Sequence, residues 1–186
     1  SGFAGELDRW LKNPEEERDV DTGRFFIGTT SSALKSIGVN KCKIYFGKGK
    51  IARIMREHPE MTADVIKKVP ELLERPILVM QSKTVANRIT LLGEVFVGDG
   101  RPVMAAVELS PQNRRGEIMN YAVIASAYPR NAVQNFINTS NILYVEPNKN
   151  RTDHWLQQIR LQLPSRVTSY GSIASVTYSS RDVNGE

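Results

Sequence analysis

The sequence contains one cysteine, two histidines and no long apolar run. The single cysteine, Cys42, rules out an internal disulfide and a cysteine-based zinc site, and its apolar surroundings (CKIYF) predict a small core residue. No apolar run approaches the ~20 residues that a membrane-spanning helix needs, so we expect no membrane partner. The chain begins at Ser1 without a charged and then apolar leader, which indicates an excised part of a longer protein.

Several motifs of common enzymes are also missing. Gly47, Gly49 and Lys50 do not have the spacing of a Walker-type phosphate loop. There is no His-x-Glu with a cysteine pair, as in zinc deaminases, and no Gly-x-Ser-x-Gly nucleophile motif. Neither histidine has a partner at the spacing of metal ligands. We therefore predict neither a metal site nor a cofactor.

Four apolar segments rich in Val, Ile, Leu and Tyr dominate the middle of the chain. They are 76–82, 88–97, 101–109 and 117–128, each bounded by turn residues, as strands are. Asp99-Gly100 predicts a type I′ hairpin turn between the second and third. Because strands joined by short links pair antiparallel, we predict a four-stranded meander. The expected fold class is α+β, with a central antiparallel β-sheet of about four strands preceded and flanked by helices at 49–73 and 150–162.

The N-terminal part is predicted to be an attachment to this unit. Residues 3–11 have apolar side chains at helical spacing, and the segment up to residue 23 reads as an acidic linker. We expect residues 1–21 to pack loosely, and we divide the chain into residues 1–23 and a single domain at 24–186. Further short strands are predicted outside the central sheet, at 24–28, 42–47, 142–146 and 169–180.

Charge is distributed unevenly along the chain, whose net charge is +5. Residues 1–21 carry seven acids and three bases, whereas residues 35–68 carry nine bases and three acids. A basic block of this kind can attract phosphate backbones through electrostatics that do not depend on sequence. The alternative is an ordinary solvated helix face.

Five phrases occur in the order GTTSSALKSIG, HPEMTADVIKKVPELLERPILVMQS, GRPVMAAVEL, IASAYPR and HWLQQIRLQLP. Their order and spacing, over residues 25–165, resemble the phage MuF C-terminal domain, a toxin-like module grouped with the barnase, EndoU, colicin and RelE-like nuclease superfamily. The resemblance implies a helix followed by an antiparallel sheet, and cleavage of RNA. It also implies RNA (with tRNA as one candidate) and a cognate immunity protein as partners. The expected place of action is the bacterial cytoplasm, within a larger phage or toxin polypeptide.

Cleavage of RNA without a metal needs a base for the 2′-hydroxyl, an acid for the leaving oxygen and cations for the phosphate. Imidazole suits the proton transfers, and His58 lies between two helices of the basic block. Its alternative role is to cap a helix C-terminus. His154, in the first turn of a late helix, is a weaker candidate. Glu108, predicted to be in a strand, is a reserve base.

Ser126, Tyr128 and Arg130 complete the predicted catalytic group. Ser126 and Tyr128 are two positions apart in a strand, so their side chains share a face and can hold a phosphate or transfer a proton. The alternative for Tyr128 is a half-buried core residue with a solvated hydroxyl. Arg130 can bind a phosphate with two hydrogen bonds. We expect the His58 ring close to Tyr128.

Six more residues are predicted to bind nucleic acid. They are Lys50, Arg53 and Lys67 of the basic block, and Ser82, Lys83 and Arg88 at one end of a hairpin. Three hypotheses follow: a phage or polymorphic-toxin effector that is a metal-independent ribonuclease, a non-catalytic domain that binds nucleic acid or a partner protein, and a toxin that acts on a nucleotide cofactor.

Overall fold

The computed structural model of the chain describes residues 2–14 and 23–178. The predicted acidic linker lies almost wholly outside these residues, as does the end of the predicted strand at 169–180. The boundary between residues 1–23 and 24–186 stays a prediction. No helix within the described residues is long and apolar enough to cross a membrane.

Helices and strands alternate irregularly along the chain. The helices are α1 (Phe3–Lys12), α2 (Ser32–Ser36), α3 (Lys48–Glu57), α4 (Ala63–Ile66), α5 (Val69–Glu74), α6 (Val133–Asn138) and α7 (Lys149–Gln158). The strands are β1 (Arg24–Thr29), β2 (Lys43–Gly47), β3 (Leu78–Gln81), β4 (Arg88–Leu92), β5 (Val103–Leu109), β6 (Ala122–Pro129), β7 (Asn141–Val145) and β8 (Gly171–Ser172).

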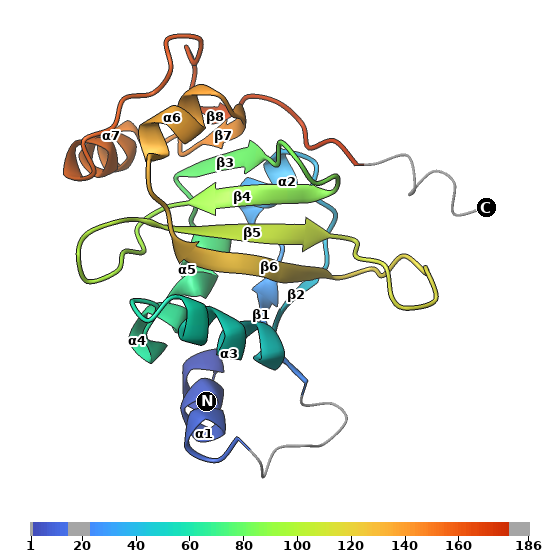
Figure 1. Cartoon of the computed structure of the whole chain (residues 1–186). Helices are drawn as coiled ribbons and strands as arrows, with labels where there is room; N and C mark the ends of the chain where they lie inside the picture. The colour runs from blue at the N-terminus through green and yellow to red at the C-terminus, as the bar shows by residue number, and fades with distance from the viewer. Residues whose placement is uncertain (1, 15–22, 179–186) are drawn as a thin grey trace.

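All these strands form one sheet, in the order β1-β2-β6-β5-β4-β3-β7-β8. The four inner strands β6, β5, β4 and β3 are the predicted antiparallel meander and cross the middle of Figure 1. The predicted fold class is nevertheless wrong, because the sheet has eight strands and is mixed. It is not the four-stranded antiparallel sheet that we expected, although the chain is α+β overall.

The additional strands join both edges of the meander. β2 pairs in parallel with β6, through Ile44–Ala122 and Tyr45–Val123, and β7 pairs antiparallel with β3. An edge strand has unpaired backbone N–H and C=O groups, which can form hydrogen bonds with a further strand. The sequence predicted these segments as strands, but their partners lie far away along the chain, and no local pattern shows such pairing.

The hairpin at Asp99-Gly100 exists with a different turn. Gly100 has φ +91°, whereas Asp99 is not among the described residues with positive φ, so the turn is not the predicted type I′. The N–H of Gly100 donates to the carbonyl of Val97 at 3.0 Å, and the N–H of Arg101 donates to the Asp99 carboxylate at 3.0 Å. The side chain of Asp99 thus stabilises the turn.

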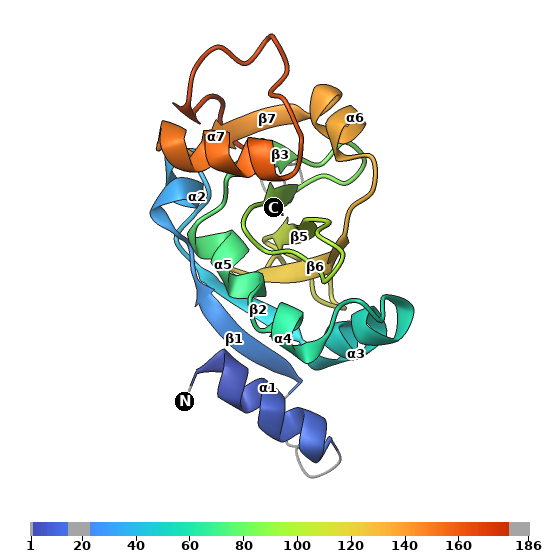
Figure 2. The same ribbon diagram turned by 90° about the vertical axis from the view of Figure 1, so that its left-hand side faces the viewer.

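Both faces of the sheet are covered with apolar side chains. One core cluster joins α1, α2 and α5 to one face, with Phe46, Leu72 and Leu91 fully buried. A second cluster joins α6 and α7 to the other face near β3 and β7, around Trp155. In the side view of Figure 2, α5 and α3 lie on different sides of β6. Successive residues of β3 are buried on both faces, which explains why that strand shows no alternation.

Helix α1 is part of the core. Leu7 has no exposed surface and Trp10 is 9% exposed. The ring of Trp10 lies 5.8 Å from that of Phe25, and Phe3 lies 5.4 Å from Phe25. The expected apolar stripe is therefore present. The expectation that this helix packs loosely is wrong, because its stripe covers β1, a strand that belongs to the main sheet.

Candidate active site

A small pocket lies between α3 and β6. Its volume is about 220 Å³, and its lining residues are Lys50, Arg53, Ile54, Glu57, His58, Ala125, Ser126 and Tyr128. Five of these were predicted as site residues: His58, Ser126 and Tyr128 for catalysis, and Lys50 and Arg53 for nucleic-acid binding. We call it the His58–Tyr128 pocket.

Helix α3 presents one side to the pocket because of its periodicity. Lys50, Arg53, Ile54 and Glu57 have the spacing i, i+3, i+4, i+7, which places them along one stripe. Ile51 and Ile54 are buried and fasten the helix to the sheet. The two cations are therefore held over β6 by the packing of their apolar neighbours.

A β-bulge shapes the wall that β6 contributes. Ala106 of β5 pairs with Ser126, but the next residue, Val107, pairs with Ile124, so Ala125 is an extra residue in β6. Bulges re-aim side chains and are frequent beside active sites. Here the bulge lets Ala125 and Ser126 both line the pocket, followed by Tyr128.

His58 closes the pocket at the end of α3. It is the C-cap residue, and its N–H donates to the carbonyl of Ile54 at 2.8 Å. Its ring stacks on Tyr128 with centroids 4.8 Å apart and an interplanar angle of 7°. The predicted closeness of these two side chains is thus confirmed. Nδ1 lies 3.6 Å from Oε1 of Glu60, which leaves Nε2 as the ring nitrogen open to a substrate.

The charges of the pocket are partly balanced. Arg53 Nε donates to the Glu57 carboxylate at 3.0 Å, and this hydrogen bond lowers the pKa of Glu57. Lys50 forms no ion pair among the described residues. The hydroxyls of Ser126 and Tyr128 likewise make no hydrogen bond within the described chain. Lys50 and both hydroxyls are thus available to a ligand.

The other five predicted residues lie away from this pocket, and Arg130 and Lys67 are the first two of them. Arg130 lines another pocket, of about 430 Å³, and its guanidinium lies 4.5 Å from the centroid of the Phe136 ring. Lys67 binds the carboxylate of Asp8 in α1 at 2.8 Å, and Asp64 is 3.7 Å away. Lys67 therefore links α1 to α4.

The predicted hairpin group has structural partners. The hydroxyl of Ser82 accepts hydrogen bonds from the N–H groups of Thr84 and Val85. The ammonium of Lys83 donates to Thr139 and lies 4.8 Å from the centroid of the Phe136 ring.

The third member of that group, Arg88, pairs with Glu108. Nη2 of Arg88 is 2.8 Å from Oε2 of Glu108, in the register that pairs β4 with β5. The side chains are 30% and 16% exposed. The carboxylate of Glu108, the reserve candidate for the general base, is therefore engaged in an ion pair with Arg88. His154 is exposed on α7 and lies outside the pocket.

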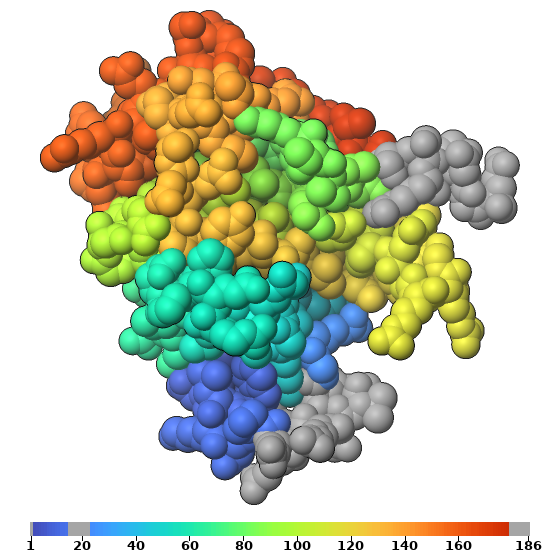
Figure 3. Space-filling view, viewed as in Figure 1, coloured from blue at the N-terminus to red at the C-terminus, as the bar shows by residue number. Residues whose placement is uncertain are grey.

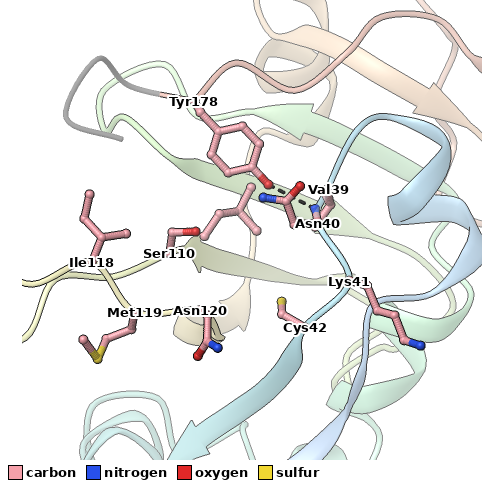
Figure 4. A pocket seen from close by; sticks show the side chains of 10 residues that line it. Val39, Asn40, Lys41, Cys42, Ser110, Ile118, Met119, Asn120 and Tyr178 are labelled. Atoms are coloured by element: carbon pink, nitrogen blue, oxygen red, sulfur yellow. Dashed lines mark hydrogen bonds between the residues drawn. The ribbon is translucent and has the colours of Figure 1, made fainter. Parts of the chain in front are cut away.

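A larger pocket lies elsewhere and contains none of the predicted catalytic or nucleic-acid-binding residues. It has a volume of about 510 Å³. Figure 4 shows Cys42, Ser110 and Asn120 among the residues that line it, with Tyr178 at its edge. The N–H of Asn40 donates to the Tyr178 hydroxyl at 3.2 Å. Cys42 is partly buried and packs against the core, close to its predicted role.

Sequence reasoning missed Glu57 and Glu60 as neighbours of the site. Glu57 was within reach of prediction, since it follows Lys50 and Arg53 at helical spacing. Glu60 is two positions after His58 and lies beyond the end of α3. Helical spacing therefore does not predict where its side chain points. Among the described residues, no group of three or more His, Cys, Asp or Glu side chains is placed to hold a metal ion.

Comparison with known proteins adds a family match. Residues 50–152 match the family described as the phage MuF C-terminal domain. The match begins at Lys50 and extends through Tyr128, so it covers the whole pocket. No curated protein and no solved structure matched the chain.

Proposed function

This chain belongs to the phage MuF C-terminal domain family, and we propose that it is an effector domain that cleaves RNA by general acid–base chemistry. The observation that carries the proposal is the His58–Tyr128 pocket. It joins one imidazole, two free hydroxyls and two cations in a volume of about 220 Å³. These are the groups that transfer of a phosphodiester requires.

The proposed step uses the 2′-hydroxyl of the RNA as the nucleophile. Nε2 of His58 accepts its proton, and the 2′ oxygen bonds to the adjacent phosphorus. The bond from phosphorus to the 5′ oxygen breaks, and that oxygen takes a proton from Tyr128. The products are a 2′,3′-cyclic phosphate and a 5′-hydroxyl, so protons and electrons balance without a further reactant. The carboxylate of Glu60 lies 3.6 Å from Nδ1, the ring nitrogen that takes no part in this step.

Lys50 and Arg53 have an electrostatic role in this proposal. The negative charge on the non-bridging oxygens of the phosphate grows in the transition state, and positioned cations stabilise it. Lys50 is the stronger contributor, because Arg53 already shares its charge with Glu57. Ser126 donates a hydrogen bond to the same phosphate.

The biological setting belongs to the same proposal. Membership of the family supports a phage origin, and the pocket supports the chemistry. We infer from both a toxin-like role within the nuclease superfamily named above, an immunity protein that covers the pocket, and action in a bacterial cytoplasm.

Incubation of the purified protein with total RNA in excess chelator tests the proposal. We expect cleavage that ends in 2′,3′-cyclic phosphates. Tyr128→Phe keeps the ring stack but removes the hydroxyl, and should slow cleavage about 100-fold or more if the hydroxyl donates a proton. Tyr170→Phe, which removes a hydroxyl near α7, is the matched control. Binding of RNA without cleavage would instead support a non-catalytic binding domain.

A further inference from the structure

A group of aromatic rings lies on the outward face of β1, β2 and the start of β6, where Phe26 is exposed and Tyr45 and Tyr121 are half-buried. Phe26 and Tyr45 have centroids 6.0 Å apart at 65°, and Tyr45 and Tyr121 have centroids 5.5 Å apart at 88°. The guanidinium of Arg24 lies 3.8 Å from the centroid of the Tyr45 ring and 4.5 Å from that of Tyr121. We call these four residues the aromatic strip.

The core does not need the strip. Phe25, Ile44 and Phe46 of the same strands point to the opposite face and are at most 3% exposed. Phe26, by contrast, is 49% exposed. β1 and β2 thus fill the core with one face and hold further aromatic rings at the surface on the other. Aromatic rings held at a surface beside a cation offer flat faces on which the rings of a ligand can stack.

The strip is also positively charged. Arg24 forms no ion pair with an acid among the described residues, since its contacts are the two tyrosine rings. Lys43 is exposed and lies two positions before Tyr45, hence on the same face. No acid belongs to the strip. Its charge therefore suits a polyanion that carries flat apolar groups.

The strip continues into the His58–Tyr128 pocket. Register pairs place Phe26 beside Tyr45, and Tyr45 beside Val123 of β6, so their side chains share one face. Ala125, the first pocket residue of β6, is two positions further on, about 7 Å along the strand. A ligand chain that lies on the strip can thus reach the pocket without crossing the sheet.

A projecting loop adds two more cations. The connection between β5 and β6 extends from the body of the molecule, as the yellow lobe of Figure 3 shows. Arg114 and Arg115 are exposed within this loop, and Tyr121 of the strip is at its base. The loop also carries the exposed Glu117, so it brings a net charge of +1 beside the strip.

We propose that the aromatic strip binds unpaired bases of single-stranded RNA next to the nucleotide that enters the pocket. Bases without a partner stack on aromatic rings and on arginine planes, whereas the bases of a duplex are stacked on each other and cannot. The inference deepens the proposed function and rests on RNA being the substrate. Arg24, Phe26 and Tyr45 precede the matched region at 50–152, so the family match does not cover them.

The test uses a probe that cannot be cleaved, a fluorescent 12-nucleotide oligouridine with 2′-O-methyl groups. We expect wild-type protein to bind it more tightly than a 2′-O-methyl duplex of equal length. Phe26→Ala should weaken binding by at least about fivefold, and Phe26→Tyr should restore it. Ile173→Ala is the matched control, since Ile173 is the other exposed large apolar side chain of the described chain, at 38%. Melting temperatures verify that each variant is folded.

Arg24→Gln provides an independent readout. It should reduce the slope of log affinity against log salt by about 0.7, which is the value for one phosphate contact on a single strand. Unchanged binding by Phe26→Ala and Arg24→Gln would overturn the proposal, and so would equal affinity for the duplex.

The two proposals fail separately. Cleavage of RNA together with normal binding by the strip variants would reject the strip and leave the function standing. Absence of cleavage, together with binding that depends on Phe26, would reject the ribonuclease and leave the strip standing.

Discussion

The imidazole of His58 lies parallel to the phenol ring of Tyr128, 4.8 Å from centroid to centroid. His58 ends helix α3, and Tyr128 is near the end of strand β6. The contact therefore depends on two features: the packing of α3 against β6, and the pairing of β6 with β2, the strand that leads directly into α3.

Lys50 and Lys67 should differ in their effect on RNA binding. Lys50→Gln removes an unpaired cation of the pocket, so it should reduce the salt slope for single-stranded RNA by about 0.7. Lys67→Gln should leave the slope unchanged, because Asp8 and Asp64 already neutralise that ammonium. Titrations of the uncleavable oligouridine over a range of salt concentrations measure both. Equal reductions by the two variants would show that Lys67 faces the nucleic acid.

Leu7 should contribute strongly to stability. Leu7→Ala removes a side chain with no exposed surface from the α1 interface, and we expect a loss of about 2–5 kcal/mol in the free energy of unfolding. Lys12→Ala, at an exposed position of the same helix, should cost little. Urea unfolding measures the difference. A loss below about 1 kcal/mol for Leu7→Ala would indicate that α1 is loosely attached after all.

The ion pair of Arg88 and Glu108 should be structural. Glu108→Gln weakens a pair that is mostly shielded from water, so it should lower the free energy of unfolding by about 1–3 kcal/mol. The control is Asp99→Asn in the more exposed pair with Arg101, where the Arg101 and Asp99 side chains are 35% and 55% exposed; we expect a clearly smaller loss. Similar small losses for both variants would contradict the assignment.

Tyr144 should make stability depend on pH at the alkaline end. Burial, together with a hydrogen bond to Glu146, raises its pKa to about 12. The folded protein then binds this proton more tightly than the unfolded chain, so the contribution is complete below about pH 10 and disappears by about pH 12. Between these values the melting temperature of wild type should fall more steeply than that of Tyr144→Phe. Parallel curves would show that the phenol titrates alike in both states.

Local patterns were sufficient to predict the inner sheet and five of the residues that line the His58–Tyr128 pocket. The apolar segments between turn residues define β3 to β6, and helical spacing predicts the buried side of α3. His58 and Tyr128 were expected to be close because the helix enters the meander from the edge where β6 ends. These inferences concern neighbours in sequence or consecutive strands.

These local patterns do not predict the pairing of strands that are far apart in the sequence. The parallel contact of β2 with β6 joins segments that are distant in the chain, so neither the eight-stranded sheet nor the aromatic strip could be inferred. The same limit applies to charges. Lys67 and Arg88 appear as free cations in the sequence, and only the fold shows that Asp8 and Glu108 neutralise them.

The most direct test of the account is the rate at which an RNA oligonucleotide is cleaved in excess chelator by wild type, His58→Ala and His154→Ala. We predict that His58→Ala loses about 10²- to 10⁴-fold in rate, the usual contribution of a general base. His154→Ala should match wild type, because His154 is exposed on α7 outside the pocket. A substrate with 2′-deoxyribose at the cleaved position should remain intact. Equal rates for His58→Ala and wild type, or cleavage of the deoxy substrate, would contradict the account.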